Sequence, residues 1–523
     1  MNIIDKVVHF FNPSAGVKRQ QARQIATIMN AGYSHGGASK RKKSMLGWIS
    51  SGGSPTEDID ENLEILRERS RDLYMNTPIA TGALKTIRTN VVGAGLRLKS
   101  QIDYTVLNMD EEQAGVWEAQ VEREFKLWSE SVFADAMRMN NFYELQQIAF
   151  LSFLMSGETF ATLPYRESPG TPYQLTVNLL EADRVTSPGG RDTETILSGV
   201  ELGQYGDVTH YHVCNVHPLT SSSKQKEWYR IPKFGEESGR QNILHLMIAE
   251  RPEQRRGVPL LSPAIEAIKQ LGRYTEAELM AALVSSMYTV FIKSDSPDEA
   301  PFGESISESD QVDAQDENSY ELGAGAIISL GEGEEIEQAN PMRNNATFDG
   351  FVRSVCRQIG SSLELPYELL LKHFTSSYSA SRAALLEAWN MFRMRREWLA
   401  ARFCQPVYEE WLAEAIALGR IDAPGYFDDP LIRKAYCGAE WNGPSQGQID
   451  PLKEVNAAIK RVDEGFSTRA KETAELTGGD FWRNLPQRIR EERAMKEGGL
   501  KDAEEVLEDD EQSEEQPAGE ADS

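Results

Sequence analysis

The apolar residues change their spacing several times along the chain, and each spacing predicts a type of element. Apolar positions three and four residues apart run from residue 58 to 156, and a spacing of two runs from about 160 to 248. Helical spacing then returns after Ser262. Because 523 residues exceed what one hydrophobic core usually serves, we expect an α+β protein of several domains.

Proline, glycine and hydroxyl side chains mark the expected ends of these elements. Pro78 should divide the first helical stretch into two helices, and Gly93 should end the second one. Two further helices are expected over 114–131 and 141–156. Strands are expected in six segments, FATLPYR, PYQLTVNLLEADRV, ILSGVEL, DVTHYHVCNV, KEWYRIPKF and NILHLMI. After them, helices are expected from Ser262 to about residue 287 and over 345–362, with a short strand AIISL between them.

A long helix is predicted over residues 381–404, with Ser379 or Ser381 as its cap and Pro406 as its end. At 100° per residue one apolar stripe collects Leu385, Ala388, Trp389, Phe392, Leu399 and Phe403. Arg396 falls in the middle of this stripe, and the other faces carry Arg382, Arg393, Arg395, Glu397 and Arg402. Periodicity alone favours an ordinary core helix whose Arg396 is paired or reaches water. A buried guanidinium would need a carboxylate or several carbonyls, from its own subunit or a neighbour.

The segment before this helix, KHFTSSYSA (Lys372–Ala380), is polar, small and aromatic. Such a composition is typical of an exposed, ordered loop between two helices. Its candidate contact residues are Lys372, His373, Thr375, Ser376, Ser377 and Tyr378. On composition alone an ordinary surface loop is the simplest interpretation.

Charge is distributed unevenly. The net charge is −26, yet the first fifty residues hold eight Lys or Arg and one Asp. The last twenty-two residues, 502–523, hold eleven acids and no base, and residues 294–321 hold ten acids. Long acidic runs with few apolar residues cannot offset the entropy of ordering, so the tail should be disordered and dispensable for assembly. An acidic chain also argues against a tight nucleic-acid binder, since phosphates require basic partners.

No motif for catalysis or cofactor binding emerges. The sequence has no phosphate-binding loop, nucleophile elbow, HExxH or CxxC motif, and VVGAGLRL (91–98) follows a helix and lacks the third glycine of a dinucleotide site. Four separated cysteines favour a reducing cytoplasm. His210 and His212 alternate as on a strand, which explains them better than a metal site. Glu158 and the acids of 181–183 fit salt bridges better than catalysis. No run of about 18 apolar residues exists, so no bilayer span is expected.

Several segments, in order over residues 60–480, carry a family resemblance. They are NTPIATGALKTIRTNVVGAGLRL (76–98), RGVPLLSPAIEAIKQL (256–271), LPYELL, SSYSASRAALLEAW, the FxxxRxxxxxxF region after it, and WNGPSQGQIDPLKEVNAAIKRVDEGFSTRAKE (441–472). In order and spacing they resemble the portal proteins of tailed bacteriophages, in the lambda-type family.

This resemblance implies a multi-domain fold with wing, stem, clip and crown parts, whose long helices line a central channel in a ring. It implies these parts: 1–57, a basic flexible arm; 58–260, a wing-like α+β domain; 261–289, the first stem helix; 290–342, a clip with an acidic insertion; 343–404, the second stem helix, the tunnel loop and the long helix; 405–485, C-terminal wing and crown helices; and 486–523, an acidic disordered tail. The acidic clip insertion departs from the simplest family pattern.

The function implied by the resemblance is a channel for DNA at one capsid vertex, without enzymatic activity or cofactor. The implied partners are further copies in a dodecameric ring, double-stranded DNA bound without sequence preference, the terminase large subunit, the major capsid or scaffold protein, and head-completion and tail connector proteins. The ring would belong to the virion, be assembled in the host cytoplasm and contact no membrane. The tunnel loop would touch DNA, and Trp389, Phe392 and Arg396 would pack helices or subunits. A non-ring scaffolding or adaptor protein, and a prohead protease or nuclease, remain the alternatives.

Overall fold

The computed structural model describes residues 13–14, 17–18, 21, 43–45, 48, 52–221, 223–286, 289–294, 334–339, 348–374, 377–447 and 451–497. The chain divides into two units, Met1–Asp58 and Ile59–Ser523. Helix α3 (Pro55–Ile59) starts in the first unit, where the side chain of Glu57 accepts the N–H of Ser54 (2.8 Å). The AIISL segment and the residues after Glu497 lie outside the described residues.

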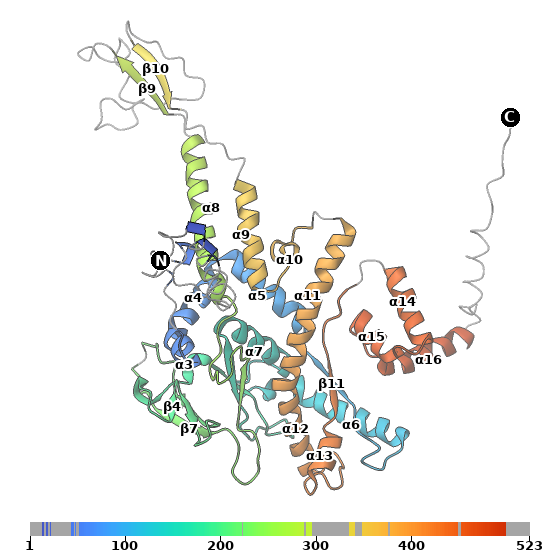
Figure 1. Ribbon diagram of the computed structural model, residues 1–523. Coiled ribbons are helices and arrows are strands. Elements are labelled where there is room, and N and C mark those ends of the chain that lie inside the picture. The colour runs from blue at the N-terminus through green and yellow to red at the C-terminus, as the bar shows by residue number, and fades with distance from the viewer. Residues whose placement is uncertain are drawn as a thin grey trace, which may run out of the picture. The chain divides into compact units, whose positions relative to one another are not determined.

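The second unit is a mixed α+β structure whose first helices and strands follow the predicted order (Figure 1). Its first half contains α4 (Leu63–Asn76), α5 (Pro78–Val91), β1 (Arg97–Ser100), α6 (Glu111–Ser129), α7 (Phe142–Ser156), β2 (Glu158–Thr162), β3 (Asn178–Glu181), β4 (Ile196–Leu197), β5 (Val200–Leu202), β6 (Val208–Cys214), β7 (Trp228–Pro232) and β8 (Ile243–Met247). As predicted, α4 and α5 separate at Pro78. Asn141 and Gly157 bound α7, since Asn141 forms a capping box with Glu144 and Gly157 adopts a φ of 83°.

The strands form small antiparallel sheets. One has the order β3-β2-β8 and a second has the order β4-β5-β6-β7. The predicted strand ILSGVEL is in fact a hairpin, because Ser198 and Gly199, both with positive φ, turn the chain between β4 and β5. β1 pairs with β11 (Ala439–Asn442), which joins two segments that lie far apart in the sequence.

The second half is mainly helical. It contains α8 (Ile265–Ser286), β9 (Thr289–Ser294), β10 (Glu334–Ala339), α9 (Phe348–Ser362), α10 (Tyr367–Leu371), α11 (Tyr378–Leu399), α12 (Gln405–Ala417), α13 (Pro430–Tyr436), α14 (Pro451–Asp463), α15 (Arg469–Thr477) and α16 (Phe481–Glu497). The antiparallel β9–β10 hairpin, which the sequence did not reveal, comes between α8 and α9 in the chain. No helix within the described ranges is long and apolar enough to cross a membrane.

Two predicted helix boundaries are wrong. Ser377, not Ser379 or Ser381, caps α11 by accepting the N–H of Ala380. Pro406 does not end the helix, because a π-helical turn over Ala400–Cys404 joins α11 to α12. The wider turn pairs the Gln405 N–H with the Ala400 carbonyl, so that Pro406, which lacks an N–H, fits in the first turn of α12.

The C-terminal boundary also differs from the prediction. Residues 486–497 are helical and belong to α16, whereas the sequence placed them in a disordered tail. Pairs four residues apart, Gln487 with Glu491 and Arg488 with Glu492, both at 2.8 Å, support this exposed helix.

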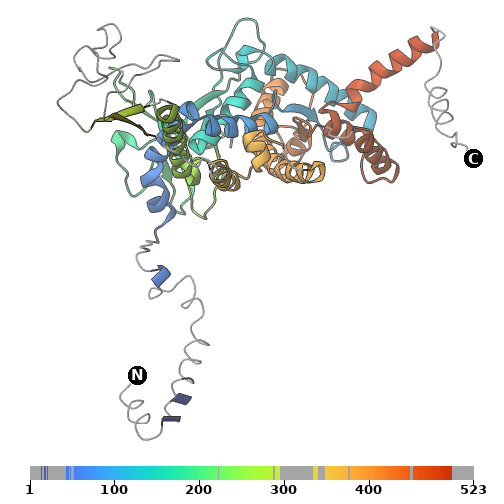
Figure 2. The same cartoon turned by 90° about the horizontal axis from the view of Figure 1, so that it is seen from above.

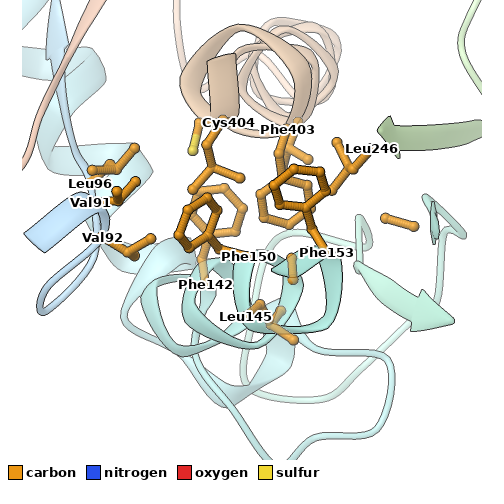
Figure 3. Close-up of a cluster of buried hydrophobic side chains, with 14 of the residues drawn as sticks. Val91, Val92, Leu96, Phe142, Leu145, Phe150, Phe153, Leu246, Phe403 and Cys404 are labelled. Carbon is orange, nitrogen blue, oxygen red and sulfur yellow. The ribbon is translucent and has the colours of Figure 1, made fainter. Parts of the chain in front are cut away.

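The main core lies where α5, α7 and the α11–α12 junction meet. Figure 3 shows Phe142, Phe150 and Phe153 of α7 directed towards Phe403 and Cys404 of the π-helical turn. The end of α5 and the segment after it contribute the neighbouring apolar side chains Val91, Val92 and Leu96. The long α11 is therefore fixed at its C-terminal end by the protein core.

Candidate channel loop and its anchors

The loop that follows α10 is positioned by a tight turn between α9 and α10. Gly360 of α9 lies against the Leu365 carbonyl, which a Cβ at this position would approach to 2.5 Å. Glu364 in this turn has a φ of 56° and accepts a hydrogen bond from Arg395 of α11 (3.3 Å). Leu365 and Leu370 are buried in the main core. The N-terminal end of the loop is thus held by packing and by an ion pair.

The loop itself leaves α10 through Lys372, which has a left-handed φ of 54°. The N–H of His373 donates to the carbonyl oxygen of Glu368 (3.0 Å). The side chains of Lys372, His373 and Phe374 are exposed, and so is that of Ser377, the cap of α11.

The remaining predicted loop residues lie elsewhere. Thr375 and Ser376 are outside the described residues. Tyr378 is the first residue of α11 rather than part of the loop, because the cap at Ser377 starts the helix earlier than expected. The structure therefore brings Lys372, His373 and Ser377 together at the exposed connection between two helices.

The opposite end of α11 is anchored by Arg396. Its Nε donates to the carbonyl of Val91 (3.1 Å), and its Nη2 donates to the carbonyls of Asn90 (2.9 Å) and Pro444 (2.8 Å). Two of these carbonyls are at the C-terminus of α5, where a helix presents unpaired acceptors and partial negative charge. Burial and the neighbouring Arg393 lower the pKa of Arg396 to about 10, so the guanidinium stays charged at neutral pH.

Trp389 and Phe392 form the apolar surface beside this guanidinium. Both are buried, their rings meet edge to face with centroids 5.8 Å apart, and Arg396 lies over the Trp389 ring at 5.4 Å. Gly443 completes the site, because a Cβ there would lie 2.6 Å from Arg396 Nε. Three segments far apart in sequence, α5, α11 and the chain after β11, meet at this side chain.

Arg395 was predicted to lie on a polar face of the helix, and this prediction is wrong. Its side chain is buried, and burial lowers the pKa of the guanidinium, an effect that Glu364 opposes. The signal was present in the helical wheel, since Arg395 lies only about 20° from Ala388 at 100° per residue. Its charge predicted an exposed position for Arg395, whereas its angle on the helical wheel is that of a buried residue.

A second buried ionic cluster holds the sheet against α4. The Glu158 carboxylate of β2 has no exposed surface and contacts Arg67 of α4 (2.5 Å), Arg256 (2.7 Å) and His245 of β8 (2.7 Å). Burial favours its neutral form, but Arg256 and Arg67 outweigh that effect and lower its pKa. The prediction that Glu158 forms salt bridges is confirmed, while its partners were not recognised because they lie about 90 residues away in both directions.

The histidines of β6 contact charged side chains of the neighbouring strands. His212 Nε2 lies 2.9 Å from Glu201, and His210 Nδ1 lies 3.7 Å from the same carboxylate, which Arg230 also binds (2.8 Å). Within the described part of the chain, no group of three or more potential ligands could hold a metal ion.

The comparisons with known proteins agree with the resemblance. A family model for phage portal proteins of the lambda family matches residues 41–396. Portal protein B of Escherichia phage lambda is 25% identical over 495 residues, which cover 90% of this chain and 91% of the relative. The portal protein of Escherichia phage N15 is 25% identical over 491 residues, with coverage of 90% and 91%.

Among solved structures, the neck of a native gene transfer agent particle computed with C12 symmetry has a TM-score of 0.42 and 14% identity. The match covers 79% of this chain and 93% of that chain. Because the family model spans most of the sequence, this chain belongs to the lambda family of phage portal proteins.

Proposed function

We propose that this portal protein assembles as a dodecameric ring around a channel for double-stranded DNA, with the α10–α11 loop directed into that channel. The observation that carries the proposal is the position of Lys372 and His373, which are exposed directly after α10 at its connection to α11. α10 is packed in the main core through Leu370, while Arg395 and Arg396 anchor the far, C-terminal end of α11. In the proposed ring, a passing duplex would meet Lys372 and His373 next to a helix that is packed in the core.

The chemistry of the loop suits transport rather than tight binding. Lys372, His373 and Ser377 can touch phosphate or sugar, and such contacts carry no sequence information. One lysine from each copy gives a sparse positive ring within an acidic protein. Weak attraction guides a polyanion without retaining it, because each phosphate contact adds to the salt-dependent affinity.

The proposed parts follow from the element order. α8 and α9 correspond to the stem, the β9–β10 hairpin to the clip, and α14–α16 to the crown, while the strands β2–β8 and helices α4–α7 form the wing. In this arrangement the ring has a head-to-tail interface that closes on itself. Its proposed partners are the terminase large subunit, the capsid or scaffold protein, and head-completion and tail proteins. The proposed place of assembly is the bacterial cytoplasm, and the ring catalyses no reaction itself.

The channel role is tested with Lys372→Asn and His373→Asn together. Asparagine tolerates the left-handed conformation at residue 372, so the pair removes the basic groups without straining the turn. We expect rings of unchanged mass by light scattering but fewer genome-filled particles in an in vivo packaging assay. The matched control is Lys85→Gln, which removes one exposed lysine from α5.

The channel role of the loop and the assembly into a ring can be refuted independently of each other. Normal DNA packaging and retention by the double variant would contradict the channel role of the loop. A monomeric or open assembly of the wild-type chain would instead refute the ring and favour a scaffolding or adaptor protein.

A further inference from the structure

The last described helix, α16, carries an excess of positive charge within an acidic chain. Its seventeen residues, FWRNLPQRIREERAMKE, contain five Arg or Lys and three Glu, whereas the whole chain has a net charge of −26. Every described side chain from Pro486 to Lys496 is exposed. The charge therefore lies on a surface that solvent or a ligand can reach.

Most of the charges on α16 are segregated. At 100° per residue, Arg483, Arg490, Arg493 and Lys496 fall within an arc of about 140°. We call these four residues the basic face. Glu491 and Glu492 fall on the opposite side, where Arg488 pairs with Glu492 (2.8 Å), whereas Glu497, the last residue of the helix, falls within the basic arc. Among the residues whose side chains the structure describes, which do not include Glu497, no carboxylate forms an ion pair with a member of the basic face.

The helix is held rigidly at its start and extends outwards from there. Asp480 accepts the N–H groups of Trp482 (2.7 Å) and Arg483 (3.1 Å), and it also pairs with Lys99 of β1 (3.4 Å). Figure 2 shows α16 extending outwards from the neighbouring helices, with its C-terminal half away from them. The start of the helix is thus tied to β1, and no other described residue of this unit buries the basic face.

We propose that the basic face of α16 binds the phosphate backbone of double-stranded DNA without reading its sequence, an inference that rests on the channel function proposed above. Arg483 and Lys496 are about 20 Å apart along the helix axis at 1.5 Å per residue. This length corresponds to about six base pairs of a duplex at 3.4 Å per step. Three guanidinium groups and one ammonium group match phosphate oxygens as charge-assisted donors. The arrangement provides a second DNA contact on the portal, distinct from the α10–α11 loop.

The test measures binding of the full-length protein to a fluorescent duplex of about 24 base pairs between about 25 and 200 mM salt. One variant, R483Q/R490Q/R493Q/K496Q, removes the basic face. Two single variants form a matched pair on the same helix, since Arg490→Gln removes an unpaired charge and Arg488→Gln removes a charge paired with Glu492. All of these side chains are exposed, and circular dichroism checks that each variant folds.

The quadruple variant should lower the magnitude of the slope of log K against log salt by about 3 to 4. Arg490→Gln should lower it by about 1, while Arg488→Gln should leave it unchanged. Equal slopes for the wild type and the quadruple variant would overturn the inference, as would equal effects of the two single variants. Oligomer mass is measured on the same samples. The absence of a ring would contradict the proposed function, whereas the salt dependence of binding tests only the DNA contact of α16.

Discussion

Replacing Arg396 with alanine removes the three hydrogen bonds that join α11 to the end of α5 and to Pro444. Each hydrogen bond to a charged group contributes about 1.5–3 kcal/mol net, so three bonds set an upper range of roughly 4.5–9 kcal/mol. Arg396 is only half-buried, and water entering the vacated space would satisfy part of the exposed carbonyls. Loss of the contact with Trp389 adds about 0.5–1 kcal/mol. We therefore expect a loss of about 2–4 kcal/mol in the free energy of unfolding.

The assay is denaturant unfolding of the assembled protein, followed by tryptophan fluorescence because Trp389 reports on the site. The control is Arg393→Ala, which removes the same group from an exposed position where Glu475 lies 3.9 Å away, and should change stability by less than about 1 kcal/mol. Lysine at position 396 keeps the charge but not the planar donors, so Arg396→Lys should recover only part of the loss. Equal stabilities of the two alanine variants would show that Arg396 does not anchor α11.

Three further predictions concern residues that stabilise the same unit, Gly360, Glu158 and Glu201. Gly360→Ala should lower the stability of the protein by about 1–3 kcal/mol in thermal unfolding, because the added Cβ would meet the Leu365 carbonyl in the α9–α10 turn. The control Gly115→Ala should be neutral or stabilising, since a Cβ at this helical position meets nothing within 4 Å. Equal effects of the two substitutions would contradict the close contact at Gly360. Glu158→Gln should lower stability by about 3–5 kcal/mol in denaturant, because it leaves buried guanidiniums without a charged partner, and a neutral effect would refute this. The hydrogen bonds from Arg230, together with that from His212, lower the pKa of Glu201 from 4.5 to about 2, so its carboxylate stabilises the sheet above pH 4.5 and this contribution disappears as the pH falls towards 2. Glu201→Gln should flatten that part of an acid titration followed by near-ultraviolet circular dichroism, and an unchanged titration would contradict the assignment.

The sequence by itself determined the elements whose signals are local. Pro78 and Gly93 mark helix ends through their own backbone preferences, and the structure places the boundary between α4 and α5 and the end of α5 beside them. The change from helical spacing to alternation likewise located β2–β8, since periodicity depends only on which face of an element is buried. The exposed connection before α11 was also recognisable, because short polar residues favour turns.

Only the tertiary structure decided which distant groups meet. The helix continues past Pro406 into α12 because the π-helical turn before it accommodates a residue without an N–H. Phe403 and Cys404 of that turn pack against α7 (Figure 3). Arg395 lies on the buried side of α11, and its guanidinium meets Glu364, about thirty residues earlier. Arg396 acquires its function from carbonyls about 300 residues earlier and from Pro444. Partners such as these carry no periodic or local signal, since their contacts exist only once the chain has closed loops of that length.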